Sequence, residues 1–242
     1  MLDNSPIDFH VRTQAIENLA KDLELYGKDN EKLRTHFEMA AFTENRLLDS
    51  VVNQIFPFMD SFGMNEQEAA NLLSLMKFGN ISYSTNPFPR VAHVLDEMRE
   101  LFTLLTAIGN GRVSRIHVHT LAYQVVMTKI DSKTNKSIWK SNKAAMAKAS
   151  LTAYRYTCNL SEIDLKQVNI LLDDSFAMTM DDKNIERIEL DQAIRCWEEN
   201  IFNPELTMNR IRVKICLAIG MVCTNVVQTV GAGDNISGTF FC

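Results

Sequence analysis

The segment from Thr229 to Ser237, close to the last residue of the chain, combines a glycine turn with an acidic side chain. The glycines permit a tight turn with outward-pointing backbone N–H groups, and a helix expected over residues 235–240 would add a partial positive charge. Such a turn binds a phosphoryl group, and Asp234 at its end could accept the proton of a hydroxyl in line with the phosphorus. Glycine turns beside acidic residues are common, so a left-handed turn capped by Asp234 is the alternative. The residues of the expected phosphate-binding turn are Gly231, Ala232 and Gly233.

Asn65 and Glu68 are three residues apart at the expected start of a helix, which puts an amide and a carboxylate about one turn apart on one face. In that arrangement they could hold a water molecule on Mg²⁺. The same pair also fits a capping box, in which each side chain bonds to the backbone of the other residue. From these residues alone the capping box is the favoured interpretation. Glu38 alone is an ordinary acidic residue on the solvent side of a strand end.

His117 and His119 are two apart on an expected strand, so both rings would project from one face and could bind a transition metal. No third ligand is evident in the sequence, and packed, hydrogen-bonded histidines are the favoured interpretation. A locally basic stretch surrounds the next expected helix. A solvated face is the usual role of such a stretch, and we assign it no function. Its lysines are Lys133, Lys136, Lys140, Lys143 and Lys148.

Apolar periodicity predicts the elements that must position these residues. Apolar side chains at helical spacing indicate amphipathic helices, and alternation at every second residue indicates strands. The expected helices cover residues 12–26, 44–59, 91–105 and 139–152, with another beginning at Asn65. The expected strands cover residues 36–42, 115–123 and 211–219, and the polar stretch 173–191 is interpreted as a surface excursion.

Helices that alternate with strands predict an α/β layered architecture, whose ligands bind at the carboxyl ends of the strands. The glycine turn follows an expected strand, which is where such a fold requires it. The chain of 242 residues has no repeat and no low-complexity tract. We therefore expect a single domain over residues 1–242.

The charge and hydropathy of the chain disfavour two classes of partner. A net charge of -5 gives no reason to expect nucleic acid, which needs a basic face. The longest apolar runs, such as residues 213–223, fall short of the roughly 20 residues needed to cross a bilayer, so no membrane span is expected. The first ten residues lack a basic start followed by an apolar stretch. The cytoplasm is therefore the expected location of the chain as written.

The five cysteines form an odd number, and no two are spaced as Cys-x-x-Cys. Neither a disulfide framework nor a zinc site is indicated. We expect buried or incidental thiols, which also fits a reducing compartment. The cysteines are Cys158, Cys196, Cys216, Cys223 and Cys242.

Taken together, four separated motifs resemble, in order and approximate spacing, the ADP-dependent glucokinase family, and most closely its animal members. Trp139 before an Ala-rich helix that ends near Cys158 also resembles that family. Four motifs in order are far more specific than any single one. The motifs are His36-Phe-Glu-Met-Ala40, Gly63-Met-Asn-Glu-Gln-Glu68, Ser114-Arg-Ile-His-Val-His-Thr-Leu121 and Thr229-Val-Gly-Ala-Gly-Asp234.

The resemblance implies a ribokinase-like core with a central, largely parallel sheet flanked by helices. It implies a glycolytic activity: transfer of the β-phosphoryl group of ADP to the 6-hydroxyl of glucose, with Mg²⁺ as cofactor and AMP and glucose 6-phosphate as products. By this resemblance Asp234 is the catalytic base, and the turn before it is the anion hole. Asn65 can cap its helix while Glu68 faces metal-bound water, so both interpretations of that pair can hold. The implied acidic magnesium site consists of Glu38, Glu68 and Asp234.

The resemblance covers nearly the whole chain but only about the C-terminal half of a family member. We therefore expect the chain to lack the first strands of the large domain and the lid domain that supplies most sugar contacts. Animal members also resemble secretory-pathway proteins, whose N-terminal targeting segment is not found here. Besides an active sugar kinase, two hypotheses stay open: a non-catalytic nucleotide-binding paralogue, and a related kinase with another donor or acceptor, such as ATP or fructose 6-phosphate. The sequence does not indicate an oligomeric state.

Overall fold

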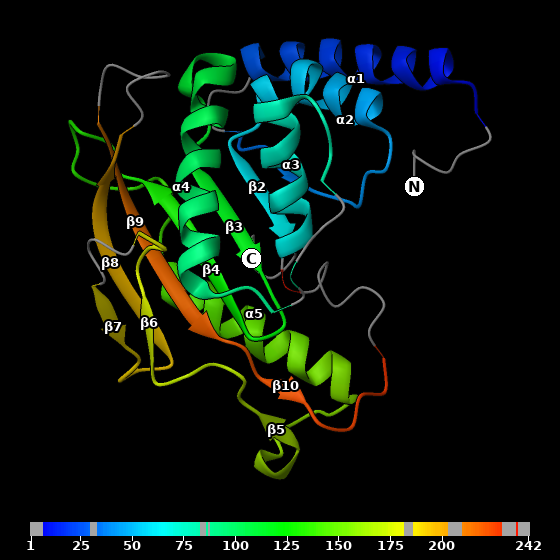
Figure 1. Ribbon diagram of the computed structural model, residues 1–242. Helices are drawn as coiled ribbons and strands as arrows, with labels where there is room; N and C mark the ends of the chain where they lie inside the picture. The colour runs from blue at the N-terminus through cyan, green and yellow to red at the C-terminus, as the bar shows by residue number, and fades with distance from the viewer. Residues whose placement is uncertain are drawn as a thin grey trace.

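The computed structural model describes residues 7–29, 33–82, 86, 88–181, 186–202, 210–228 and 236. At its centre lies a six-stranded sheet in the order β1-β2-β3-β4-β9-β8 (Figure 1). The first three strands pair in parallel, and the remaining neighbours pair antiparallel. Four strands, β1, β2, β3 and β9, therefore run in one direction, and β4 and β8 run in the other. The strands are β1 (His36–Glu38), β2 (Ser61–Asn65), β3 (Arg115–His119), β4 (Tyr123–Lys129), β8 (Ile194–Ile201) and β9 (Ile211–Ile219).

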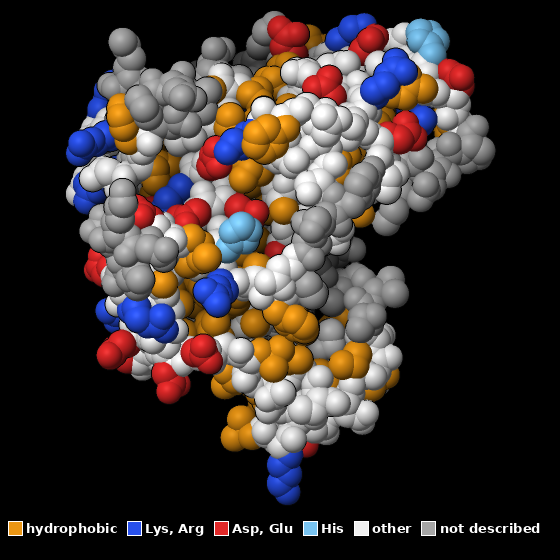
Figure 2. All heavy atoms as spheres, viewed as in Figure 1, with side chains coloured by type: hydrophobic (Ala, Val, Ile, Leu, Met, Phe, Trp, Pro, Cys, Tyr) orange, Lys and Arg blue, Asp and Glu red, His pale blue; other side chains and the backbone are white. Residues whose placement is uncertain are grey.

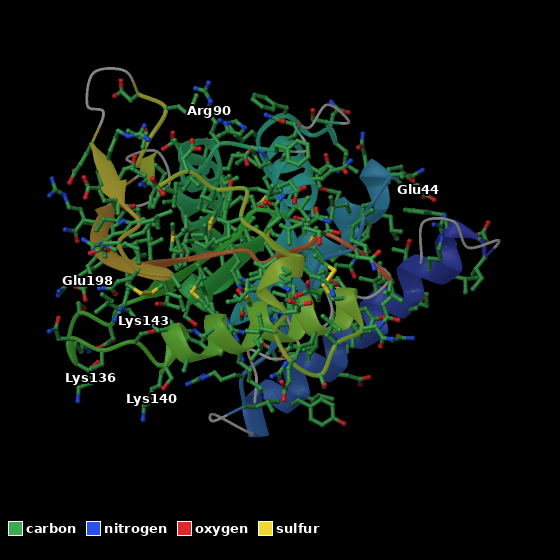
Figure 3. All side chains as sticks on the ribbon, turned by 90° about the horizontal axis from the view of Figure 1, so that it is seen from below. Glu44, Arg90, Lys136, Lys140, Lys143 and Glu198 are labelled. Carbon is green, nitrogen blue, oxygen red and sulfur yellow. A yellow bond between two sulfur atoms is a disulfide. The ribbon has the colours of Figure 1, made fainter. Side chains whose placement is uncertain are left out.

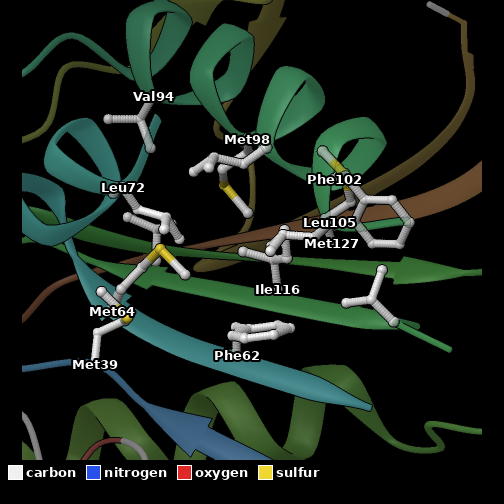
Figure 4. Packing of buried hydrophobic residues seen from close by; sticks show 14 of the residues in the cluster. Met39, Phe62, Met64, Leu72, Val94, Met98, Phe102, Leu105, Ile116 and Met127 are labelled. Carbon is white, nitrogen blue, oxygen red and sulfur yellow. The ribbon is translucent and has the colours of Figure 1, made fainter. Parts of the chain in front are cut away.

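Helices cover both faces of this sheet, which confirms the expected α/β layered architecture. Helices α3 and α4 lie over one face, and α5 lies over the other (Figure 1). Figure 4 shows Met98 and Leu105 of α4 packed above Ile116 and Met127 of the sheet. The central strands are buried on both faces because helices shield both. The face towards α3 and α4 is apolar, whereas the face towards α5 also carries buried polar side chains such as His117 and Gln124. The helices are α1 (Phe9–Asp29), α2 (Asn45–Gln54), α3 (Glu66–Phe78), α4 (Val91–Ala107) and α5 (Asn142–Cys158).

The expected elements are confirmed with changed bounds. The first helix is longer than the apolar stripe indicates, and the strand expected over residues 36–42 keeps only its first three residues. The strand expected over residues 115–123 is wrong at its end, because the chain turns after β3 and Tyr123 begins β4. The surface excursion 173–191 includes two short paired strands, β6 (Ser175–Ala177) and β7 (Arg187–Glu189). A further small sheet pairs β5 (Val168–Asn169) with β10 (Val222–Cys223).

The prediction of free thiols is wrong for four of the five cysteines, since two disulfides are present (Figure 3). Cys158 at the end of α5 is bonded to Cys223 of β10. Cys196 and Cys216 lie opposite each other on β8 and β9 and form the second bond. Sequence spacing gave no sign of either pair, because the fold brings the partners together from 65 and 20 residues apart. Disulfides persist in oxidising surroundings, so the cysteines no longer support a reducing compartment.

None of the helices in the described part of the chain is both long enough and apolar enough to span a bilayer.

Candidate functional site

Three parallel strands end side by side at one edge of the sheet (Figure 1). Several residues singled out by sequence lie at this edge: Glu38, Asn65, Glu68 and His119. Glu38 of β1 lies opposite Gly63 of β2, and Asn65 of β2 lies opposite His119 of β3. Glu68 follows within the first turn of α3. Because the carboxyl ends of parallel strands are where α/β folds bind ligands, this edge is the candidate site.

Two histidines hold the carboxylate of Glu38. His36 Nε2 lies 3.0 Å from Glu38 Oε2, and His119 Nε2 lies 3.6 Å from Glu38 Oε1. Each carboxylate oxygen therefore faces a different imidazole, one from the same strand and one from β3. The Glu38 side chain is 26% exposed, so the carboxylate stays accessible to a ligand.

A chain of hydrogen bonds supports His36 from the interior. Arg115 Nε donates to Ser61 Oγ at 2.7 Å, and Ser61 Oγ lies 3.0 Å from His36 Nδ1. Because an ionised carboxylate only accepts hydrogen bonds, His36 Nε2–H donates to Glu38 Oε2, and in the neutral ring Nδ1 then accepts from the Ser61 hydroxyl. The Arg115 guanidinium lies 3.9 Å from the centroid of the Trp139 ring. Burial lowers the pKa of Arg115 to about 10, so it remains charged at neutral pH and anchors the chain.

Gly63 leaves the space that the Glu38 carboxylate occupies. A Cβ atom at Gly63 would overlap with Glu38 Oε2 and would lie 3.1 Å from His36 Cε1. Both of these are side-chain atoms, so a larger residue would push the carboxylate away while leaving the backbone of β2 in place. Gly63 therefore determines where the carboxylate lies.

Asn65 and Glu68 form the capping box that the sequence favours. Glu68 N donates to Asn65 Oδ1 at 2.9 Å, and Asn65 N donates to Glu68 Oε2 at 2.8 Å. A cap of this kind stabilises a helix by about 1 kcal/mol. Burial raises the pKa of Glu68 to about 7; the bond from Asn65 and the charge of His119 oppose this rise, and the charge of Glu38 adds to it. The charges of Glu38 and His119 thus both act on the carboxyl group of Glu68.

The raised pKa of Glu68 predicts that the metal-free protein loses stability as the pH rises from about 4.5 to about 7. In this window the folded state keeps the Glu68 proton and the unfolded state has lost it, so folding is favoured at the acidic end. The shift from 4.5 to about 7 corresponds to roughly 3 kcal/mol at most. Urea unfolding in EDTA at about pH 5 and about pH 7.5 checks this expectation. Glu68→Gln should remove most of the difference, whereas Glu162→Gln, at an exposed site, should keep it; an unchanged difference in Glu68→Gln would contradict the shift.

His117 is a packed, hydrogen-bonded histidine, as expected. Its Nε2 donates to Gln124 Oε1 at 3.1 Å, and Gln124 Nε2 donates to Met146 O. Burial, with the neighbouring charge of His119, lowers the pKa of His117 to about 3, so the ring is neutral. Within the described residues, no group of three or more His, Cys, Asp or Glu side chains is arranged to hold a metal ion.

A cavity of about 300 Å³ opens beside the candidate site, between the β3–β4 turn and β10. Most of its lining is apolar and includes Met221 and Val226, while His119 lines it on the side of the candidate site. Gly220 brings its backbone against the turn: Gly220 N donates to Ala122 O at 2.8 Å, and a Cβ would lie 2.8 Å from Ala122 C. Figure 2 shows hydrophobic side chains gathered on this part of the surface, over α5 and β10.

The expected phosphate-binding turn and base lie outside the described residues, so their geometry stays a prediction. Ile236, two residues beyond Asp234, is described; it lines the cavity and packs against a buried apolar cluster. Ile236 therefore lies beside the candidate site, two residues after the expected base. The residues left as predictions are Gly231, Ala232, Gly233 and Asp234.

The side chains at this edge suit a hard cation. Mg²⁺ prefers oxygen ligands, and Glu38 and Glu68 supply carboxylates within electrostatic reach of each other. Gly63 keeps open the space in which the Glu38 carboxylate lies. Two of the three acidic residues expected to hold the metal are therefore brought together, and the third, Asp234, lies outside the described residues.

Comparison with known proteins gives a match over the whole chain. The model of a family described as the ADP-specific phosphofructokinase/glucokinase conserved region matches residues 1–242. The chain is 32% identical over 215 residues to an ADP-dependent glucokinase of Bos taurus, and 27% identical over 221 residues to a probable ADP-dependent glucokinase of Caenorhabditis elegans. These alignments cover 85% and 86% of this chain but only 39% and 40% of the relatives. The chain therefore spans about two-fifths of the length of the curated relatives it matches.

The fold is also found among solved structures. One is described as an ADP-dependent kinase complex with fructose-6-phosphate and ADPβS; the TM-score is 0.56 at 19% identity, over 95% of this chain and 47% of that chain. At this identity the likeness concerns the fold alone, and it agrees with the expected core of a sheet flanked by helices.

Proposed function

This chain belongs to the ADP-specific phosphofructokinase/glucokinase family, and on that premise we propose that it carries the phosphoryl-transfer site of an ADP-dependent sugar kinase. The reaction would move the β-phosphoryl group of ADP to a sugar hydroxyl and release AMP. The observation that carries this proposal is the meeting of motif residues at one sheet edge. Glu38, Glu68 and His119 come from three separate motifs and interact electrostatically.

In this proposal Glu38, Glu68 and Asp234 would hold Mg²⁺, which when bound neutralises charge on the phosphate groups of the nucleotide. His36 and His119 keep the Glu38 carboxylate oriented through the contacts described above. This orientation matters because phosphoryl transfer without a covalent intermediate relies on positioning.

The proton transfer in this proposal belongs to Asp234. Its carboxylate would accept the proton of the sugar hydroxyl while the oxygen of that hydroxyl bonds to the phosphorus. The backbone N–H groups of the preceding turn would bind the oxygens of the phosphoryl group. Ile236 beside the candidate site supports this assignment, because it is only two residues beyond Asp234.

The cavity beside His119 is the proposed site of the nucleotide base. A flat heteroaromatic ring suits a lining that is mostly apolar with a few polar groups, and Glu66 and Ser150 supply such groups here. His119 lies at the boundary, since it lines the cavity and also faces Glu38. A nucleotide base in the cavity would thus direct the diphosphate towards the carboxylates.

The proposed acceptor is the 6-hydroxyl of glucose, in line with the name of the Bos taurus relative. Fructose 6-phosphate is the second candidate, because the solved relative holds that sugar phosphate together with ADPβS. The described residues give no reason to prefer one acceptor over the other, so the experiment must include both.

The test is an assay of the purified chain with ADP, Mg²⁺ and each acceptor in turn, with AMP and the phosphorylated sugar measured as products. ATP replaces ADP in a parallel series. Isothermal titration calorimetry with ADP and with AMP measures binding separately from turnover. Stoichiometric AMP and sugar phosphate from ADP would support the proposal, and the better acceptor would identify the substrate.

Two outcomes would replace this proposal. Nucleotide binding without product, from both acceptors, would indicate a non-catalytic nucleotide-binding protein. Faster turnover with ATP than with ADP would keep the assignment as a sugar kinase but would reject ADP as its phosphoryl donor.

A further inference from the structure

A second hollow, of about 330 Å³, lies at the opposite edge of the sheet, where the parallel strands begin. Its walls come from the segments that precede β1, β2 and β3 and from the loop that follows β4. This edge is at the other end of the strands from Glu38 and Asn65, and none of the proposed kinase residues lines the hollow. The ionisable side chains in its walls are Arg34, Asp60, Arg112, Lys129, Asp131 and Lys136.

The hollow is positively charged although the protein is acidic. Four cationic and two anionic side chains line it, which gives a formal charge of 4 − 2 = +2, whereas the chain carries -5. An excess of one sign of charge in a concave site concentrates counter-ions more strongly than the same charge on an open surface. Basic residues that only face solvent do not need to line a concave site. The concave shape therefore favours a binding site for a ligand over a solvated face.

The carboxylate of Asp60 is already committed to its neighbours. Its side chain is 5% exposed. Asp60 Oδ2 accepts from Thr35 N at 2.9 Å, from Thr35 Oγ1 at 3.0 Å and from Arg112 Nη2 at 3.0 Å. Arg34 Nη1 lies 3.7 Å from Asp60 Oδ1, beyond hydrogen-bond distance. Asp60 thus fixes Arg112 and forms a longer ion pair with Arg34, whose guanidinium donates no hydrogen bond to that carboxylate.

Asp131 is likewise used by its own loop. Asp131 Oδ1 accepts from Thr134 N at 2.7 Å and from Lys133 N at 3.1 Å. Asp131 N donates to Lys136 O at 3.0 Å, which closes the loop and fixes the backbone that carries Lys136. The carboxylate therefore serves the turn and forms no ion pair with Lys136 in the described part of the chain.

The two lysines supply the uncompensated charge. Lys129 Nζ donates to Gly111 O at 3.3 Å, and neither lysine forms a carboxylate ion pair with another described residue. Figure 3 shows Lys136 on the loop before α5, with Lys140 and Lys143 on the same side of the molecule. Two ammonium groups and two guanidinium groups supply many hydrogen-bond donors and no acceptor.

We propose that this hollow is a second anion-binding site, which takes a small phosphorylated molecule. Guanidinium and ammonium groups together match the several oxygens and the multiple charges of a phosphate or diphosphate. A nucleic acid is a poor occupant, because the chain as a whole is acidic and the basic groups are confined to one small hollow.

The site adjoins the hydrogen bonds that support Glu38. Asp60 and Ser114 line the hollow, and Ser61 and Arg115, the next residues along the chain, bond to each other beneath His36. An anion at this edge would therefore contact the strand starts that hold the supporting hydrogen bonds.

Calorimetry of the full chain with pyrophosphate, in EDTA and at physiological salt, tests the proposal. The wild-type protein should bind pyrophosphate saturably at this hollow, separately from any binding at the proposed nucleotide site. Replacing both Lys129 and Lys136 by alanine should weaken binding by about tenfold or more, because two charge-assisted contacts are lost. Lys133→Ala is the matched control: it removes the same charge from the same loop outside the hollow, and its affinity should stay within about twofold of wild type.

Two further variants make the test decisive. Asp131→Asn keeps an oxygen for the turn but removes a negative charge, so pyrophosphate should bind more tightly. The single variant Lys136→Ala, at an exposed site, should weaken binding even if the double variant does not fold. The absence of saturable binding, equal weakening by Lys133→Ala and Lys136→Ala, or unchanged binding in the double variant would each overturn the proposal.

Discussion

Replacing Asp234 by asparagine is expected to slow phosphoryl transfer by about 10²–10⁴-fold, the range that a positioned general base contributes. Asparagine has the size of aspartate and can still form hydrogen bonds, but it cannot take the proton of the sugar hydroxyl. Initial rates of AMP formation at saturating ADP and sugar measure the effect. Calorimetry with ADP should show little change, because the base acts on the acceptor and the nucleotide is held by other groups.

Asp49→Asn is the matched control for this experiment. Asp49 is exposed on α2 and belongs to none of the four motifs, so the same chemical change there should leave the rate within about twofold of wild type. Turnover by Asp234→Asn within twofold of wild type, in a chain whose unmodified form is active, would remove Asp234 from its assigned role.

Replacing Gly63 by alanine is expected to lower the apparent affinity for Mg²⁺ by about 10–100-fold, the usual effect of disturbing groups that orient metal ligands. The added Cβ would occupy the position of Glu38 Oε2. The carboxylate is the far end of a flexible side chain, so it would move aside and β2 would keep its place. The expected result is therefore a folded protein in which the Glu38 carboxylate has moved from its position near Glu68.

Calorimetry with MgCl₂ measures the affinity without requiring turnover, and urea unfolding checks the fold. Gly27→Ala is the matched control. A Cβ at Gly27, within α1, would meet its nearest atom at 3.7 Å, an ordinary contact, and alanine favours a helix over glycine by about 1 kcal/mol. Equal Mg²⁺ affinities in the two variants would contradict the role given to Gly63.

Local features of the fold could be predicted from the sequence because their interactions are local. The capping box needs only Asn65 and Glu68, and both of its hydrogen bonds join residues three apart. Helix α4 follows from the spacing of its apolar residues, eight of which are buried. Periodicity placed β9 correctly for the same reason.

The support of Glu38 could not be predicted, because it depends on strand register. Ser61 and Arg115 are 54 residues apart and meet because the first residue of β2 pairs with the first residue of β3. His119 of β3 reaches Glu38 of β1 across the one strand between them, β2, because of the same pairing. A serine and an arginine at the starts of strands form no distinctive pattern in sequence. Arg115 does lie within one of the four motifs, and Ser61 lies two residues before another.

The disulfides and the β3–β4 turn were missed for different physical reasons. Cysteine spacing is informative when partners are near in sequence, and Cys158 and Cys223 are 65 residues apart. The turn lies within a continuous apolar stretch, and its formation depends on Thr120, whose side chain accepts from Ala122 N and Tyr123 N. Threonine is typical of strands as well as turns, so its type alone did not indicate the reversal.

The junction between β2 and α3 has a consequence for motion. Asn65 is both the last residue of the strand and the cap of the helix, so no connecting loop exists there to act as a hinge. The capping box further restrains the first turn of α3, and Glu68 moves only with the sheet. Any conformational closure around a substrate would therefore involve other walls of the site, such as the β3–β4 turn. The carboxylates of Glu38 and Glu68 therefore lie on a rigid part of the fold, and any change of shape at the site is expected in the segments around them.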